Sequence, residues 1–418
     1  MMTQQTPGLA GPLTARLYAV VTALIFLLFV TNLDLFLSVR GYLPISTLIL
    51  FVGVSGALLM VTLICGDGPS LDRFWRLLEE NRVVLGLFLL WVMCYAIAAG
   101  RTVLSGEDVD YVQIFPILQF AVLAVGIAVA ATDADGHRTT QAARLAILLL
   151  SASIVYETVV PGVLGSATAR TGGVALNANI PGFILPSLLA LSLDFRRIRA
   201  MDGIMIVVTL VGVTATLSRM GIAFLALVIG TYLLFHFATG TPQERRRKVA
   251  FSGIMAAVLA LVGAGSLFVL SGLTGVDAEF QSRVVAILAG TDALDDPYRG
   301  PLMEHFLSVA SENPWLGQGA GETLMNAVSR APLQLGPHNM YVRAWIDAGM
   351  ASLAVYGAFV VAIISLGILR RSVACTMIGV LIALYGLFSH NVADNKAIFL
   401  LAGVALGHSA LRQIAWRG

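Results

Sequence analysis

Residues 203–237 read GIMIVVTLVGVTATLSRMGIAFLALVIGTYLLFHF. Two apolar runs, Gly203–Leu217 and Gly221–Phe237, are separated only by Ser218, Arg219 and Met220. Each run approaches the roughly 20 residues that a helix needs to cross the hydrocarbon core of a bilayer. The stretch therefore predicts two membrane-spanning helices joined by a minimal turn that carries an arginine.

The same pattern recurs along the whole chain. Of its 418 residues, 58% are hydrophobic and only 12% are charged, whereas soluble domains carry about 25% charged residues. We therefore predict an all-α integral membrane protein. Twelve spans are expected, at about Leu17–Phe36, Pro44–Ile64, Val83–Ala99, Phe115–Ala131, Leu145–Leu164, Ile180–Leu193, Gly203–Leu217, Gly221–Phe237, Val249–Leu270, Met350–Leu369, Val373–Phe388 and Ala397–Leu411.

The distribution of Lys and Arg predicts the orientation of these spans. Seventeen of the 26 cations fall in one alternate set of short loops and in the two termini. The positive-inside tendency places this set in the cytoplasm. Both termini are then cytoplasmic, and the apolar run after Arg16 is retained as a span rather than cleaved as a signal. The predicted organisation is residues 1–270 with helices one to nine, residues 271–338 as a large outer loop, and residues 339–418 with the last three helices.

Three short motifs inside this framework are interpreted as structural. Pro301–Ser311 places Leu302, Phe306 and Val309 on one helical face, which predicts an amphipathic helix lying on the membrane. The glycine-rich run GQGAG at 317–321 indicates a tight turn, because no strand precedes it as in a dinucleotide loop. The sequence Asp133-Ala134-Asp135 indicates a solvated turn rather than a metal site. The cysteines Cys65, Cys94 and Cys375 lie in or beside apolar runs and predict no disulfide framework.

Arginines in the outer loops run against the positive-inside tendency and are candidates for function. Arg219 lies in the minimal turn, and Arg170 and Arg299 lie in longer outer segments. Singly, each is explained by a snorkelling or salt-bridged side chain. Together they supply guanidinium forks that suit phosphate oxygens.

A histidine at the end of the outer loop joins these arginines. His338 follows Pro337 and precedes Asn339, which is expected to cap the coming helix. A near-neutral imidazole is suited to accept a proton, although an interfacial histidine of structural role is the alternative. His390 and Asn391 repeat the His-Asn pair in the next outer turn.

The order of these motifs resembles a known family. The first motif is Arg170 followed by Asn177-Ala178-Asn179. After it come, in order, Ser218-Arg219-Met220-Gly221, Arg299, the sequence NPWLGQG at 313–319, and Pro337-His338-Asn339 with Asp347-Ala348-Gly349. This order looks like the O-antigen ligase and polymerase superfamily over about residues 170–349. The chain departs from the family pattern in having Ala178 where a proline is usual and Asp347 where a glutamate is commoner.

The resemblance implies a GT-C-like fold of about twelve spans with one large periplasmic loop between helices 9 and 10. It also implies an O-antigen ligase of the bacterial inner membrane. Such an enzyme transfers a glycan from undecaprenyl diphosphate to a sugar hydroxyl of lipid A-core at the periplasmic face, with inversion. The expected base is His338, the expected diphosphate ligands are Arg219, Arg299 and Arg170, and the expected supporting residues are Asn339, His390, Asn177 and Asn179. No nucleotide, metal, other cofactor or nucleic acid is expected.

Three alternatives remain open from the sequence. A polymerase of lipid-linked glycans uses the same donor chemistry. A metal-dependent glycosyltransferase would use an acidic base, for which Asp34, Glu107, Asp108 and Asp110 are candidates. A transporter of lipid-linked glycans would need ionisable residues near the bilayer midplane, where Glu157 is the clearest example. The roles of Arg283, Arg330 and Arg343 stay open, with a structural role favoured for Arg343.

Overall fold

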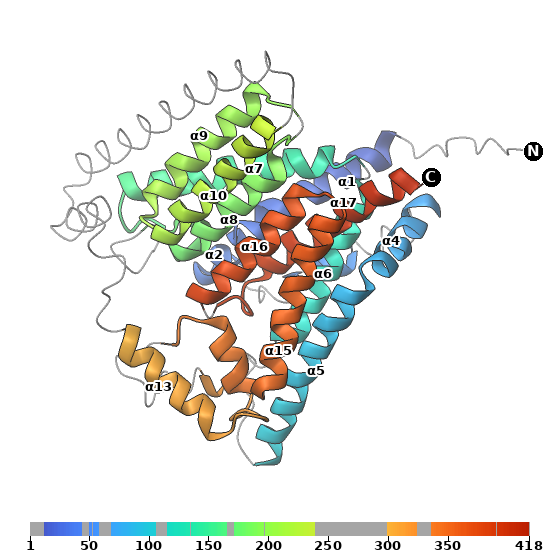
Figure 1. Ribbon diagram of the computed structural model, residues 1–418. Coiled ribbons are helices and arrows are strands. Elements are labelled where there is room, and N and C mark those ends of the chain that lie inside the picture. The colour runs from blue at the N-terminus through green and yellow to red at the C-terminus, as the bar shows by residue number, and fades with distance from the viewer. Residues whose placement is uncertain are drawn as a thin grey trace, which may run out of the picture.

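The computed structural model describes residues 12–43, 50–51, 53–57, 68–105, 115–133, 135–164, 171–195, 197–238, 299–323, 336–389 and 391–417. Within these ranges the regular structure is entirely helical (Figure 1). The elements in the first half are α1 (Pro12–Ile25), the π-helical turn η1 (Phe26–Val30), α2 (Leu33–Val39), α4 (Gly68–Glu80), α5 (Arg82–Leu104), α6 (Phe115–Thr132), α7 (His137–Val159), the 3₁₀ turn η3 (Gly173–Ala175) and α8 (Asn179–Ser192). The remaining elements are α9 (Ala200–Ala215), α10 (Arg219–Ala238), α13 (Arg299–Glu312), α15 (Met340–Leu369), α16 (Val373–Phe388) and α17 (Lys396–Arg417).

Several of these helices are suited to cross a membrane. Among the described residues, five are long and apolar enough: α5, α7, α10, α15 and α17. A sixth candidate is the segment from Arg16 to Val39, which is bent by 58° between η1 and α2. Shorter apolar helices lie in α6, α8, α9 and α16. The described part of the chain is therefore all-helical and has the several apolar helices of a multi-pass membrane protein, as predicted. The predicted spans Pro44–Ile64 and Val249–Leu270 lie largely or wholly outside the described residues, so the count of twelve stays a prediction.

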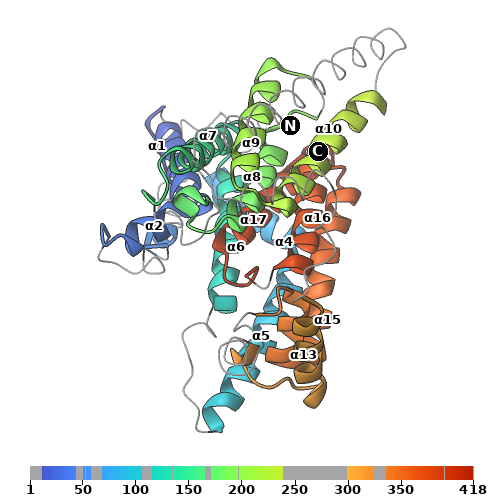
Figure 2. The same cartoon turned by 90° about the vertical axis from the view of Figure 1, so that its left-hand side faces the viewer.

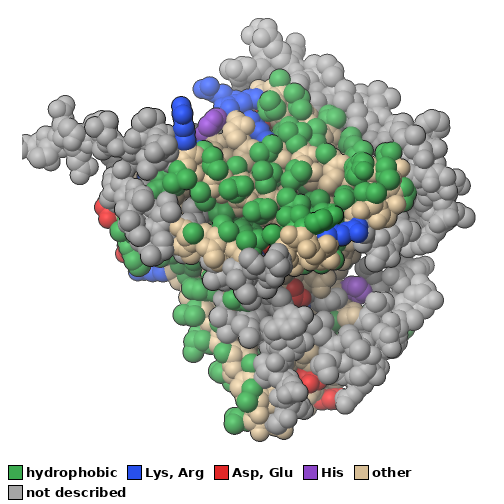
Figure 3. Space-filling model, turned by 180° about the vertical axis from the view of Figure 1, so that it is seen from behind, with side chains coloured by type: hydrophobic (Ala, Val, Ile, Leu, Met, Phe, Trp, Pro, Cys, Tyr) green, Lys and Arg blue, Asp and Glu red, His purple; other side chains and the backbone are tan. Residues whose placement is uncertain are grey.

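The surface of the helical bundle agrees with a lipid environment. Figure 3 shows one broad face covered mainly by hydrophobic side chains, with several Lys and Arg side chains along its upper margin. Along α5 the exposed large hydrophobic side chains include Leu89, Leu90, Met93 and Ile97. Exposed apolar area of this extent is expected where lipid replaces water as the solvent.

The centre of the bundle is built on close helix contacts. Gly126 of α6 and Gly403 of α17 meet so closely that a methyl group on Gly403 would lie 2.2 Å from the carbonyl oxygen of Leu123. Small residues permit this approach, which is a common means of packing helices in membranes. Beside this contact, the rings of Phe88, Phe359 and Phe399 pack together at centroid distances of 4.9 to 6.4 Å. The aromatic contact joins α5, α15 and α17 into one core.

Helix α13 confirms the amphipathic helix predicted at 301–311, but its apolar face has a different partner. Leu302, Phe306 and Val309 are buried against Val342 and Ile346 of α15. Figure 2 shows α13 lying beside the lower part of α15. The prediction that this face lies on the membrane is therefore corrected: protein covers these three side chains, because α15 begins ten residues before the predicted span and offers them an apolar surface.

A break divides α15 into two segments. Ala348 and Gly349 have non-helical backbone angles, with Gly349 at φ 79° and ψ −179°. The turn that follows α13 is hydrogen-bonded to this break. The amide of Met350 donates to the carbonyl of Pro314 at 2.9 Å, and the amide of Gln318 donates to the carbonyl of Ile346 at 2.7 Å. The motif NPWLGQG therefore packs directly against the break in α15 at Asp347-Ala348-Gly349.

Gly349 is expected to be intolerant of substitution. A methyl group at this position would lie 2.1 Å from the carbonyl oxygen of Trp315, and its positive φ is unfavourable for other residues. Gly349→Ala is expected to cost about 2–5 kcal/mol, as the sum of about 1–2 kcal/mol for left-handed strain and about 1–3 kcal/mol for overpacking. Thermal unfolding in detergent measures the effect as a lower Tm. The matched control is Gly357→Ala, later in α15, where a methyl group would meet nothing within 4 Å. Equal Tm values for the two variants would contradict the prediction.

Candidate functional site

His338 is held at the start of α15 by the residue that follows it. The side-chain oxygen of Asn339 accepts hydrogen bonds from the amides of Tyr341 at 2.9 Å and Val342 at 3.1 Å. This confirms the predicted helix cap. His338 itself has φ 48°, in the left-handed region where histidine is one of the few enriched non-glycine residues. Its side chain is half-buried. The geometry of the cap therefore fixes the direction in which the backbone presents this imidazole.

Arg219 is the first residue of α10, and its neighbours build the turn around it. The hydroxyl of Ser218 accepts from the amide of Gly221 at 3.2 Å, and the hydroxyl of Thr216 accepts from the amide of Ser218 at 3.1 Å. Gly221 packs on Gly182 of α8, where a methyl group would lie 2.8 Å from the Gly182 Cα. The motif Ser-Arg-Met-Gly is thus a capped, tightly packed turn that holds an exposed arginine at a helix N-terminus.

The segment before α8 carries the two predicted asparagines. The side chain of Asn177 accepts from the amide of Asn179 at 3.0 Å, so Asn177 stabilises the entry to the helix and Asn179 begins it. Upstream, the carboxylate of Glu157 accepts from the amides of Gly172 at 3.1 Å and Gly173 at 2.8 Å. Glu157 therefore binds the backbone that follows Arg170, at the end of α7 rather than at its middle.

These three helix starts lie at one end of the bundle. The hydroxyl of Tyr341, in the first turn of α15, donates to the carbonyl of Ala383 near the end of α16 at 3.2 Å. The ring of Tyr385 in the same turn of α16 lies 4.9 Å from that of Phe183 in the first turn of α8. Gly182 beside it contacts Ser218 and Gly221. The starts of α15 and α8 are thus connected through α16, and the start of α10 packs directly on that of α8.

Other predicted site residues are placed only in part or not at all. Arg299 is the first residue of α13, and its side chain is not described. Arg170 and His390 lie outside the described residues, as do Arg283, Arg330 and the acidic candidates Glu107, Asp108 and Asp110. Their roles stay predictions.

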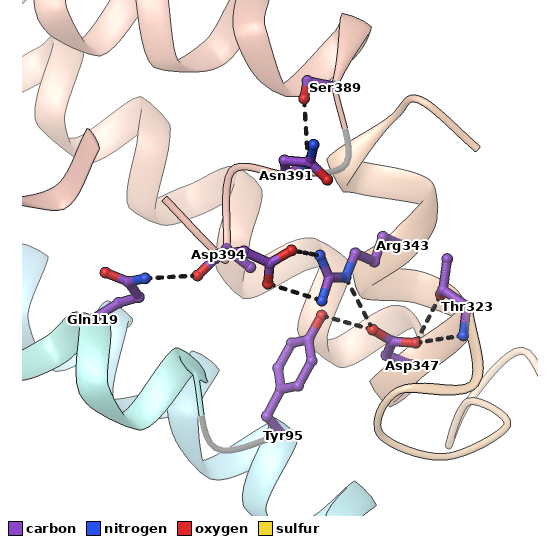
Figure 4. Close-up of polar contacts among 9 residues, drawn as sticks. Tyr95, Gln119, Thr323, Arg343, Asp347, Ser389, Asn391 and Asp394 are labelled. Atoms are coloured by element: carbon purple, nitrogen blue, oxygen red, sulfur yellow. Dashed lines mark hydrogen bonds and ion pairs between the residues drawn. The ribbon is translucent and has the colours of Figure 1, made fainter. Parts of the chain in front are cut away.

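A buried polar cluster lies one turn into α15 (Figure 4). The guanidinium of Arg343 donates to both oxygens of Asp394, at 2.6 and 3.1 Å, and to Asp347 at 3.4 Å. Asp347 also accepts from the hydroxyl of Tyr95 at 3.3 Å, and from the amide and hydroxyl of Thr323 at 2.9 and 2.7 Å. The side chains of Arg343 and Asp347 are 3% and 1% exposed. Five residues from four segments therefore share one charged network.

This cluster was not predicted from the sequence, although a structural role was favoured for Arg343. Arg343 and Asp347 are four residues apart, the spacing of neighbours on one helical face. Because the predicted span started at Met350, Arg343 and Asp347 were placed outside the membrane-spanning segments. Ionisable residues inside an apolar helix require partners, so a membrane helix extending back to Met340 would have predicted an anionic partner for Arg343, and the structure shows that Asp394 is one.

The structure also places the acidic candidate Asp34 and the predicted turn residue Asp133. The ammonium of Lys396 lies 2.8 Å from the carboxylate of Asp34, which is fully buried. Asp34 therefore neutralises a cation between α2 and α17. Asp133 accepts from the amides of Arg138 at 3.2 Å and Thr139 at 2.7 Å. The predicted turn at Asp133-Ala134-Asp135 is confirmed, but Asp133 is a buried helix cap rather than a solvated residue.

The fold and these contacts define a multi-pass membrane protein with a capped histidine, an exposed arginine and a buried ion network at one end of its helices. Within this class, residues 204–357 match the family model described as O-antigen ligase. This stretch runs from α9 into α15, and the match confirms the resemblance found in the motifs. The family implies a membrane glycosyltransferase-like enzyme with ligase- or polymerase-like activity. No match was found among curated proteins.

Proposed function

We propose that the protein is an O-antigen ligase that transfers a glycan from undecaprenyl diphosphate to a sugar hydroxyl of lipid A-core. The observation that carries the proposal is the capped His338 at the start of α15, within the matched family domain and at the same end of the bundle as Arg219. The orientation proposed from the Lys and Arg distribution puts this end at the periplasmic face of the inner membrane.

In this proposal His338 is the general base. The acceptor hydroxyl attacks the anomeric carbon of the donor sugar while its proton passes to the imidazole of His338. The bond between the anomeric carbon and the diphosphate oxygen breaks, and undecaprenyl diphosphate leaves with the bonding electron pair. A single displacement inverts the anomeric carbon. The imidazolium then returns its proton to water, which restores the base.

Arg219 and, in the same proposal, Arg170 and Arg299 stabilise the leaving group. A diphosphate is already a stable anion, so positive charge aimed at its oxygens is of more use than a proton donor. The start of α10 adds to the charge of Arg219, because the first amides of a helix have no intrahelical partner and favour anions. The diphosphate linkage itself supplies the driving free energy, so no nucleotide is required.

The test uses the purified protein in nanodiscs with an undecaprenyl-diphosphate glycan as donor, with and without lipid A-core. Products are sized by gel electrophoresis and mass spectrometry. Glycan attached to lipid A-core only when that acceptor is present is the expected result. Lengthening of the lipid-linked glycan without lipid A-core would instead establish a polymerase. Donor crossing the bilayer without any new glycosidic bond would establish a transporter and overturn the proposal.

A further inference from the structure

We infer that Asp347, Arg343 and Thr323 are positioning residues for the proposed transfer reaction, which fix the start of α15, and with it His338, relative to three other segments. The inference rests on the proposed function for its catalytic part. Its structural part, that the network is one restraint on these segments, stands on the contacts alone. None of the three residues is required to touch substrate.

The carboxylate of Asp347 accepts hydrogen bonds from three different residues. One of its oxygens accepts both hydrogen bonds from Thr323, and the other accepts from Tyr95 and from Arg343. Thr323 ends the described segment that follows α13, and that segment is also bound to α15 through Gln318. The chain on the N-terminal side of residues 324–335 is therefore fixed to α15, and the chain on their C-terminal side enters α15 through His338.

Arg343 connects the first turn of α15 to the turn before α17. Its amide donates to the carbonyl of Asn339 at 3.1 Å, so Arg343 lies one helical turn below the cap. Its guanidinium holds Asp394 in the turn before α17, and the carbonyl of Ala393 in the same turn accepts from Gln119 of α6 at 2.9 Å. The first turn of α15 is therefore connected to α5, to the turn before α17 and to the segment before residue 324.

The charges of this network neutralise one another inside the protein. One guanidinium lies between two carboxylates, and Arg343 and Asp347 are almost without exposure to solvent. A buried charge that loses a partner is left uncompensated at a large energetic cost. Rotation of α15, or withdrawal of any of the connected segments, would break part of the network. A catalytic base gains from such a restraint, because small misplacements of reacting groups reduce rates strongly.

The experiment must separate positioning from general stability, so it begins with the mildest change. Thr323→Val removes one hydroxyl hydrogen bond to Asp347 and keeps the shape of the side chain and the amide bond. We expect kcat for glycan transfer to fall about tenfold, as for loss of a hydrogen bond to a charged group, while KM for the lipid-linked donor stays within about twofold. The control is Thr214→Val, a buried threonine whose hydroxyl, among the described residues, donates to the carbonyls of Leu210 and Val211 within α9. This variant should transfer as the wild type does.

Hydrogen exchange supplies a readout that does not depend on activity. In Thr323→Val the amides of residues 317–323 and of the first turn of α15 are expected to exchange about tenfold faster, with Tm close to that of Thr214→Val. A second variant, Asp394→Asn, removes the negative charge that Arg343 binds. It should accelerate exchange in the same first turn of α15. Coincident effects from the two sides support one connected network.

The outcomes distinguish this inference from the proposed function. If the wild type transfers glycan and Thr323→Val keeps the wild-type kcat, the positioning role is overturned even if exchange is faster. If the wild type transfers nothing, the proposed function fails. The restraint is then judged by exchange alone: faster exchange in both variants supports it, and unchanged exchange overturns it. A fall in kcat without any change in exchange would also overturn it.

Discussion

Replacing His338 by alanine is expected to reduce glycan transfer by about three orders of magnitude, the middle of the range for loss of a general base. The protein is expected to insert and purify at the wild-type level, because the capping hydrogen bonds of α15 come from Asn339 and not from His338. Initial rates with undecaprenyl-diphosphate glycan and lipid A-core measure the effect. The same loss should appear in kcat and in kcat/KM, since a base acts in the transition state.

The left-handed backbone of His338 supplies the control for this experiment. At φ 48° an alanine is strained, whereas asparagine tolerates the conformation. His338→Asn therefore removes the imidazole with little backbone cost. We expect it to be as inactive as His338→Ala. An active Asn variant beside an inactive Ala variant would mean that the residue is needed for backbone geometry alone and would remove it as the base. His137→Ala, at an exposed histidine at the start of α7, should retain the wild-type rate.

Features that depend on a few consecutive residues were predictable from the sequence. The span Val373–Phe388 was predicted with the bounds that α16 has. The cap by Asn339, the turn at Ser218-Arg219 and the glycine turn at 317–321 were also predicted, and Gly317, Gly319 and Gly321 all have positive φ. Each is a local outcome: an apolar run of sufficient length, an asparagine before a helix, or glycines where other residues are strained.

Features that depend on distant contacts were not predictable in the same way. The burial of Val342 and Ile346 depends on their contact with α13, which no local pattern at 340–349 indicates. The network of Arg343 joins residues up to 252 positions apart, as in the contact between Tyr95 and Asp347. A single sequence shows that Arg343 and Asp347 are ionisable, and only the packing of α5, α15 and the turn before α17 shows that they neutralise one another.

The turn at Arg219 is the place where local sequence and long-range packing coincide, and it gives the second prediction. Gly221 must approach Gly182 for α8 and α10 to meet, and Ser218 must cap α10 for the turn to close. Both requirements fix the backbone of Arg219 while leaving its side chain exposed. An exposed guanidinium on a backbone that packing fixes is suited to bind the oxygens of an anionic ligand.

Arg219→Lys is expected to reduce transfer about a hundredfold, the lower end of the loss seen when one donor to a developing anion is removed. Lysine keeps the charge but is a point donor, whereas the guanidinium fork binds two phosphate oxygens at once. The loss should be shared between KM for the donor and kcat, because the diphosphate is present in the ground state and gains charge in the transition state.

The control for Arg219→Lys is Arg197→Lys, at an exposed arginine between α8 and α9 at the opposite end of these helices. This control should leave the rate unchanged.

A competition experiment separates charge from geometry: inorganic diphosphate should inhibit the wild type at concentrations that leave Arg219→Lys little affected. If Arg219→Lys transfers glycan at the wild-type rate and is inhibited equally by diphosphate, Arg219 serves the turn and not the donor. The leaving group would then have to be bound by other residues, and Arg170 and Arg299 would be the next to replace. If instead only the Lys variant loses transfer and inhibition together, the start of α10 is the diphosphate site of the proposed reaction.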